Sequence, residues 1–113
     1  MAADVLSQAG VGVHLFDAMP SVGRKFLLAG RGGLNLTHAE PMPTFASRYS
    51  AGAAELAPML CAFDNTAVQA WAGELGVPTF VGSSKRVFPT GMKASPLLRA
   101  WLRRLQQPAQ GVP

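Results

Sequence analysis

Two groups of polar residues near the start of the chain have types and spacing that suit a nucleotide-like ligand. Asp17 directly follows a β-branched and aromatic run over residues 11–16. A carboxylate at the end of such a strand can accept a hydrogen bond from a ribose hydroxyl. Arg24 and Lys25 fall in the first turn of a short helix-like stretch, where a bound anion would offset charges that oppose the helix dipole.

A third group is the glycine-rich loop over residues 30–38, GRGGLNLTH. Backbone without side chains can approach a flat ring or a phosphate closely. The candidate binding residues of this loop are Gly32, Gly33, Asn35 and Thr37. No Cys or carboxylate cluster accompanies His14 or His38 at metal-ligand spacing, so we predict no metal site.

Each group also has an ordinary structural explanation. Asp17 could be a turn residue after a strand, because aspartate is common there. Arg24 and Lys25 could be solvated surface charges. The glycine-rich loop could be a plain surface turn, since Gly, Asn and Thr all favour turns.

The apolar pattern predicts the elements that would position these groups. Residues 1–8 form an expected helix, with Gly10 suited to a left-handed cap after it. An expected strand over residues 11–16 is followed by a short helix over residues 21–30 with Ser21 as its N-cap. A helix, a glycine turn, a strand and a terminal acid form the second half of a βαβ dinucleotide-binding unit.

The first half of that unit has no counterpart in the sequence. A strand and a G-x-G-x-x-G loop should lie about 20 residues before the acid, and counting back from Asp17 passes Met1 first. We therefore expect the chain to be a fragment that lacks this strand and loop. Without that neighbour, the strand over residues 11–16 would be an unpaired apolar edge, through which self-association is expected.

From residue 41 onward the pattern changes to short helices. We expect helices over residues 43–49, 53–63 and 65–75, with Asp64 as the N-cap of the third and Gly76 as its stop. Their apolar residues recur at helical spacing and are expected to form a core rather than to contact a cofactor. These residues are Phe45, Tyr49, Leu56, Leu60, Phe63, Val68, Trp71 and Leu75.

The last third of the chain predicts a small hairpin and a final helix. Residues 79–81 and 86–88 form the expected hairpin, and residues 95–105 the expected helix, with Pro96 at its first turn. The basic residues of this helix are expected mostly on its solvated face: Arg99, Arg103 and Arg104.

Composition excludes several classes of protein. The 113 residues are 49% hydrophobic and only 14% charged, which favours a globular chain over a disordered one. The formal net charge is +4, but the basic residues never form a long run, so a nucleic-acid partner is not expected. No apolar run approaches the ~20 residues of a membrane span, so we expect a cytoplasmic protein with no membrane partner. The single Cys61 is expected to be buried.

Two long stretches resemble a known family. They are FDAMPSVGRKFLLAGRGGLNLTH over residues 16–38 and TFVGSSKRVFPTGMKASPLLRAWLRRL over residues 79–105. With the pair Phe63 and Asp64, they resemble bacterial NAD(P)/FAD-dependent oxidoreductases of the BaiN-like or aminoacetone-oxidase-like type. The match covers most of the chain.

The resemblance implies FAD as cofactor, redox chemistry at the flavin with NAD(P)H as electron donor, and a small-molecule substrate in the full-length protein. It places Asp17 at the adenosine ribose and Arg24 and Lys25 near the cofactor. Gly32, Gly33, Asn35 and Thr37 would lie around the flavin-side loop. No side chain need be the chemical catalyst. Because the phosphate loop is missing, we expect the isolated chain to hold FAD poorly and to be inactive.

We therefore expect an α/β chain. Residues 1–40 would be a partial Rossmann-like FAD-binding unit, and residues 41–113 a mainly helical segment with a hairpin, incomplete at its C-terminus. Two other functions stay open. One is a non-catalytic helical interaction module that ignores flavin. The other is an anion or nucleic-acid binder, whose binding would weaken with salt, built on Arg24, Lys25, Arg31, Lys85 and Arg86.

Overall fold

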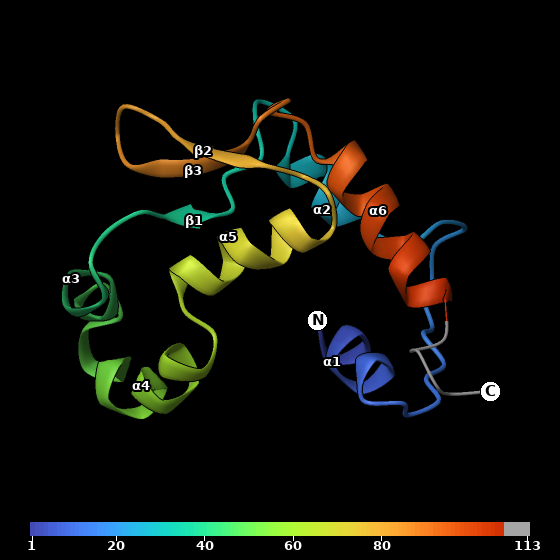
Figure 1. Ribbon diagram of the computed structural model, residues 1–113, viewed down its shortest axis with the longest axis horizontal. Coiled ribbons are helices and arrows are strands. Elements are labelled where there is room, and N and C mark those ends of the chain that lie inside the picture. Colours follow the sequence, from blue (N-terminus) through green and yellow to red (C-terminus); the bar gives the residue numbers. More distant parts are fainter. Residues whose placement is uncertain (108–113) are drawn as a thin grey trace.

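The computed structural model describes residues 1–107, which form helices and a small sheet that lies at one edge of the molecule over α5 (Asn65–Glu74) (Figure 1). The α-helices are α1 (Ala2–Gln8), α2 (Arg24–Ala29), α3 (Met42–Ser47), α4 (Ala53–Ala62), α5 (Asn65–Glu74) and α6 (Ser95–Gln106), with a 3-10 turn, η1 (Ser50–Gly52). The strands are β1 (Thr37–His38), β2 (Thr79–Val81) and β3 (Arg86–Pro89). The division of the chain at residue 40 stays a prediction.

The sheet is antiparallel, in the order β1-β3-β2, so β3 lies between the other two strands. The predicted hairpin is confirmed, with Phe80 opposite Phe88. β1 was not predicted. It belongs to a longer extended segment that runs beside β3, because Leu36 N–H donates to the carbonyl of Val87 at 2.8 Å and Ala39 N–H to that of Lys85 at 2.7 Å.

The core forms where α5, α6, α2 and the glycine-rich loop meet. Trp71 of α5 packs edge-on against Trp101 of α6, with ring centroids 4.8 Å apart, and Phe26 of α2 also packs edge-on against Trp101, with centroids 6.2 Å apart. Leu34 and Leu97 are buried against this aromatic group. Burial of these side chains holds the loop onto two helices that lie far from it in the sequence.

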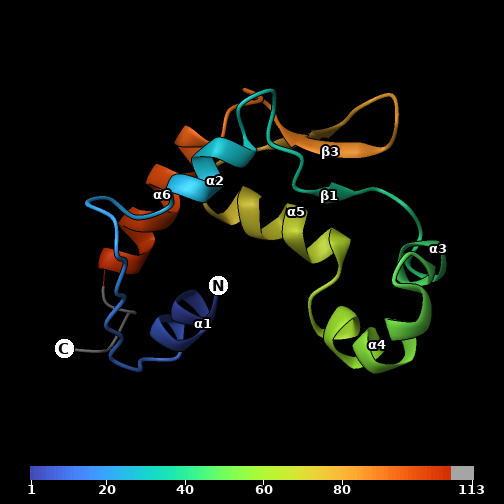
Figure 2. The same cartoon turned by 180° about the vertical axis from the view of Figure 1, so that it is seen from behind.

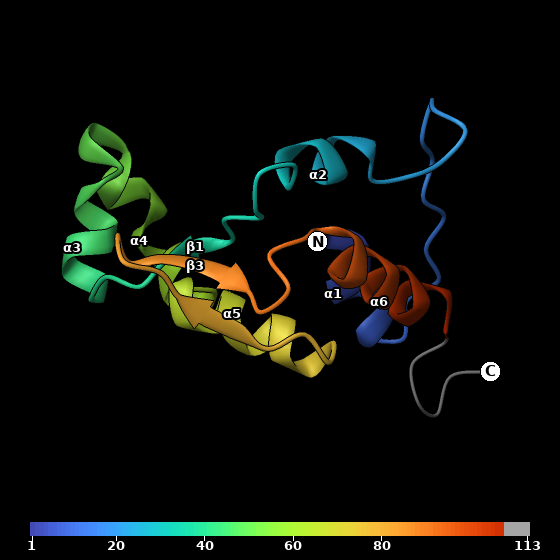
Figure 3. The same cartoon turned by 90° about the horizontal axis from the view of Figure 1, so that it is seen from above.

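The predicted core is only partly right. Of its eight residues, Trp71 is buried, Tyr49 and Phe63 are exposed, and the other five are half-buried. Several of them lie on α3 and α4, which pack on each other at one end of the molecule, away from α1 and α6 (Figures 1 and 3). Helical spacing identifies an apolar face, but it does not say what covers that face.

Two further predictions are wrong. Residues 11–16 form no strand, because a strand requires hydrogen bonds to a neighbour and none of the described residues provides them. Cys61 is exposed rather than buried, since α4 contacts only its neighbours α3 and η1 closely and leaves this face uncovered.

The helix ends follow local chemistry. Asp64 caps α5 as predicted, accepting a hydrogen bond from Ala67 N–H at 2.7 Å. Gly10 and Gly76 have positive φ after α1 and α5, which confirms both stops. Ser21 is not the N-cap of α2; that position is Gly23, and the Ser21 hydroxyl instead accepts a hydrogen bond from Arg24 Nε at 3.1 Å.

A buried ion pair joins the two ends of the described chain. Asp4 of α1 is buried, and its carboxylate lies 2.9 Å from Nε of Arg104 on α6, while Glu74 of α5 lies 3.5 Å from Nη1 of the same guanidinium. The prediction that Arg104 is solvated is therefore wrong, whereas Arg99 and Arg103 are exposed as expected. From behind, α1 lies beside the lower, C-terminal end of α6 (Figure 2).

Among residues 1–107, no helix combines the length and apolar character that crossing a bilayer demands.

Replacing Arg104 by Ala should destabilise the chain strongly. The substitution leaves the Asp4 carboxylate buried without its partner, which costs about 3 kcal/mol. Arg103→Ala is the matched control, because Arg103 is exposed on the same helix and should change stability by at most about 0.5 kcal/mol. Urea unfolding followed by tryptophan fluorescence measures both; equal losses for the two variants would show that the ion pair contributes nothing.

Candidate cofactor-binding site

Asp17, Arg24 and Lys25 line one hollow at the start of α2. Met19, Gly23 and Phe26 complete its wall, and its volume is about 220 Å³. The structure thus brings together three of the predicted site residues. We refer to this feature as the Asp17 hollow.

Local backbone geometry shapes the Asp17 hollow. Oδ1 of Asp17 accepts a hydrogen bond from Met19 N–H at 2.9 Å, which turns the chain back toward α2. Gly23 has φ of +78°, and a Cβ built on it would lie 2.8 Å from Cδ1 of Leu98. Only glycine therefore allows α2 to begin so close to α6.

The charged groups of the hollow make local hydrogen bonds but no ion pair among the described residues. Arg24 donates through Nε to Ser21, and neither Arg24 nor Lys25 forms an ion pair within residues 1–107. Both side chains are exposed, as is that of Asp17. Two cations and one carboxylate therefore face solvent around the same hollow, where a ligand that carries both hydroxyl and phosphate groups could engage them.

The glycine-rich loop is held tightly from one side. Leu34 N–H donates to the carbonyl of Met92 at 2.7 Å. Gly33 has φ of +126°, and a Cβ there would lie 2.8 Å from Cε of Met92; a Cβ on Gly30 would lie 2.5 Å from that of Ala94. Internal packing therefore explains the glycines at positions 30 and 33.

Gly32 has no such internal explanation. It is exposed, and a Cβ built on it meets no described atom within 4 Å. Asn35 is also exposed, whereas Thr37 is half-buried and its backbone is used by β1. None of the four loop candidates lines the Asp17 hollow. The predicted site residues thus form two separate groups, connected by the single short helix α2.

A family model described as "HI0933-like protein Rossmann domain" matches residues 1–112. The chain belongs to this family. HI0933-like proteins form an FAD-dependent oxidoreductase family within the BaiN-like superfamily, which confirms the resemblance found in the sequence and the α/β class. A comparison with curated proteins found no significant match.

The residues of this HI0933-like chain suit parts of a flavin cofactor. A ribose needs a hydroxyl acceptor, and Asp17 offers a carboxylate whose Oδ1 is already oriented by Met19. The pyrophosphate of FAD is an anion, for which Arg24 and Lys25 are suitable partners. The open backbone at Gly32 leaves room for a group to approach from outside the chain.

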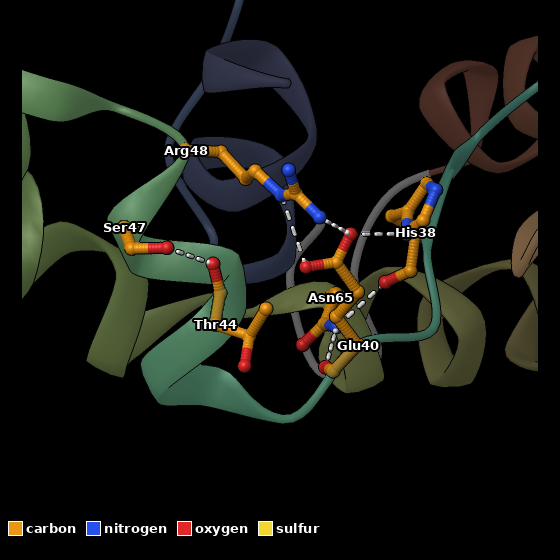
Figure 4. A network of polar contacts seen from close by, with 6 residues as sticks. All are labelled: His38, Glu40, Thr44, Ser47, Arg48 and Asn65. Atoms are coloured by element: carbon orange, nitrogen blue, oxygen red, sulfur yellow. Dashed lines mark hydrogen bonds and ion pairs between the residues drawn. The ribbon is translucent and has the colours of Figure 1, made fainter.

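A polar network at the end of the loop was not predicted (Figure 4). Glu40 is buried, with its side chain only 5% exposed. Its two oxygens accept hydrogen bonds from Nη2 and Nε of Arg48, at 3.0 and 3.1 Å, and Oε1 also lies 2.7 Å from Nδ1 of His38. The hydrogen bonds from Arg48 hold the pKa of the Glu40 carboxyl below its usual range.

Asn65 completes this network. Its Nδ2 donates to the carbonyls of His38 and Glu40, at 2.6 and 2.8 Å, so the first residue of α5 is tied to the end of the glycine-rich loop. Asn65 is buried, and the two carbonyls satisfy both of its donors. The sequence offers only a weak indication of this network, because Glu40 and Arg48 lie eight residues apart, on either side of the start of the helix predicted at residue 43.

Gly33→Ala should destabilise the chain by about 1–3 kcal/mol, because alanine is strained at this φ and its methyl group would meet Met92. Gly32→Ala should leave stability nearly unchanged, since its position is open. Thermal unfolding of both variants provides the comparison. Equal melting temperatures for the two would mean that the Gly33 backbone is not constrained as described.

Glu40→Gln should lower stability at neutral pH, and the loss should fade in acid. Because the folded pKa of Glu40 lies below its unfolded value, its contribution is present above the unfolded pKa and is lost as the pH falls through the folded pKa. Urea midpoints of the wild type and the variant, from about pH 7 to about pH 3, measure this convergence. Glu55→Gln, at an exposed position, is the control; a constant gap between wild type and Glu40→Gln would contradict the prediction.

Proposed function

We propose that this chain supplies part of the FAD site of a flavin-dependent oxidoreductase that takes electrons from NAD(P)H. The observation that carries the proposal is the gathering of Asp17, Arg24 and Lys25 around one hollow, in a chain that belongs to the HI0933-like family along nearly its whole length. A carboxylate beside two uncommitted cations matches the ribose and phosphate parts of one dinucleotide.

In this proposal each group binds rather than reacts. Asp17 accepts a hydrogen bond from a ribose hydroxyl, and Arg24 and Lys25 neutralise phosphate oxygens. Gly32 and Asn35 form an open backbone and amide surface for the flavin side, with Gly33 and Thr37 setting the course of the loop behind them. The bound flavin would supply hydride or electron transfer, so the described residues position the cofactor and need not transfer protons.

The alternatives fit the structure less well. A pure helical interaction module leaves the unpaired charges of the Asp17 hollow without a role. A general anion binder would favour cations only, but a carboxylate lies in the same hollow and would repel a bare anion. A ligand with both hydroxyl and phosphate groups accounts for both signs of charge.

FAD titration of the purified chain tests the proposal, through the flavin absorbance between about 350 and 500 nm and quenching of flavin fluorescence. We expect weak but saturable binding. Asp17→Asn should weaken it about tenfold, the effect of losing one charge-assisted hydrogen bond. Gly32→Ala should weaken it without destabilising the fold, because its methyl group occupies the open approach.

Glu55→Gln removes a carboxylate on α4, outside both groups of site residues, and should leave FAD affinity unchanged. Titration with free AMP and with FMN tests the two ends of the cofactor separately. Asp17→Asn should weaken the binding of AMP, and Gly32→Ala should weaken the binding of FMN. The proposal is contradicted if the chain shows no saturable response to FAD, or if Asp17→Asn and Gly32→Ala both bind FAD like the wild type.

A further inference from the structure

The segment that links α1 to α2 carries a row of unused backbone groups. Val11 N–H donates to the carbonyl of Leu6, but no N–H or carbonyl of residues 12–16 makes a hydrogen bond within the described chain. The segment runs between the two helices as an open trace (Figures 1 and 3). Each of these groups must otherwise be satisfied by water or by another strand.

Side chains of this segment alternate between two faces. The rings of His14 and Phe16 stack with centroids 6.5 Å apart, so these two residues share one face, as in a strand. Leu15 points to the other face, where it lines an apolar groove of about 120 Å³ with Leu98, Trp101 and other residues of α6. An extended, apolar segment therefore lies beside an apolar helix surface.

We propose that this segment pairs with the same segment of a second copy of the chain, as an antiparallel two-stranded ribbon around a twofold axis at Val13. In this register Val13 lies opposite itself, and Val11 lies opposite Leu15 of the second copy. Val11, Val13 and Leu15 of both copies, six side chains in total, fall on the face that already carries Leu15. Pairing therefore extends the apolar surface along α6. The proposal does not depend on flavin binding.

Self-complementarity identifies a second copy as the occupant. The odd-numbered residues of the segment are all apolar, so the symmetric register matches apolar with apolar throughout. Residues 11–16 contain no Lys, Arg, Asp, Glu or Pro, which are the residues that usually protect exposed edges from pairing. Phe16 is 90% exposed and Val11, Val13 and Leu15 are exposed as well, a large apolar surface to leave in water.

The test is the mass of the flavin-free chain in solution, by size-exclusion chromatography with light scattering over a concentration series. The wild type should form a dimer, of twice the 11.9 kDa chain mass. Val13→Lys should be a monomer, because two lysines would meet at the axis. Val81→Lys is the matched control: Val81 is exposed on β2, an edge strand of the sheet, and its variant should stay dimeric.

Hydrogen exchange locates the interface. In a two-stranded ribbon every second amide donates to the second copy, so alternate amides of residues 12–16 should be protected in the wild type and in Val81→Lys, and should exchange freely in Val13→Lys. An excess of a synthetic peptide of residues 11–16 should dissociate the unmutated dimer, which keeps the test independent of any folding defect in a variant.

Four results overturn the proposal: a wild type that is monomeric at every concentration, a dimer that survives Val13→Lys, a dimer lost in Val81→Lys, or a dimer whose residues 12–16 exchange freely. Loss of FAD binding with an intact dimer would instead count against the proposed function alone.

Discussion

Hydrogen bonding to β3 is the constraint on which the position of the candidate loop depends. β3 pairs with β2 on one side, and on the other side with a segment that extends beyond β1, so that Leu36 and Ala39 also donate to the β3 strand and its turn. Val87, in the middle of β3, is fully buried. A displacement of β3 would move residues 36–39, because their backbone groups would lose their partners together.

Aromatic packing and an ion pair between helices form a second constraint, which fixes how α1, α5 and α6 lie against one another. Trp71 and Trp101 pack edge to face, and Arg104, one turn from Trp101, reaches the buried Asp4. The ion pair joins residues 100 positions apart, so α1 is held to α6 by a contact between the two ends of the described chain. Its strength depends on burial: at the surface, the same pair would contribute little.

Local rules predicted much of this structure from sequence. The capping aspartate before α5, the glycine after it and the hairpin of β2 and β3 follow from chemistry within a few residues, and all three are confirmed. One local prediction failed, since the N-cap of α2 is Gly23 and not Ser21, but the larger failures concern partners at long range. A strand at residues 11–16, a buried Cys61 and a solvated Arg104 were wrong because each depended on which distant element lies alongside, and periodicity carries no such information.

In the candidate site, too, the local contacts could be predicted from sequence and the long-range contacts could not. Asp17, Arg24 and Lys25 do meet, because they lie within one turn and one helix start, where sequence spacing translates directly into distance. The Glu40 network could not be foreseen, since it needs Asn65 to reach back to carbonyls 25 and 27 residues earlier. Whether each of the predicted residues touches a cofactor stays a prediction, which the titrations above would settle.

The glycine-rich loop is fixed at one end by close packing and at the other by hydrogen bonds and an ion pair. At its start, Gly30 packs against Ala94 so closely that no side chain fits between them. At its end, Asn65 holds the carbonyl of His38, and Glu40 is held by Arg48. Between these anchors, Arg31, Gly32 and Asn35 are exposed, and a Cβ on Gly32 would meet no described atom within 4 Å. A loop that is rigid at both ends and bare in the middle loses little conformational entropy when a ligand binds, which favours binding by preorganisation. In the proposed FAD site, the buried network would contribute to affinity without touching the cofactor.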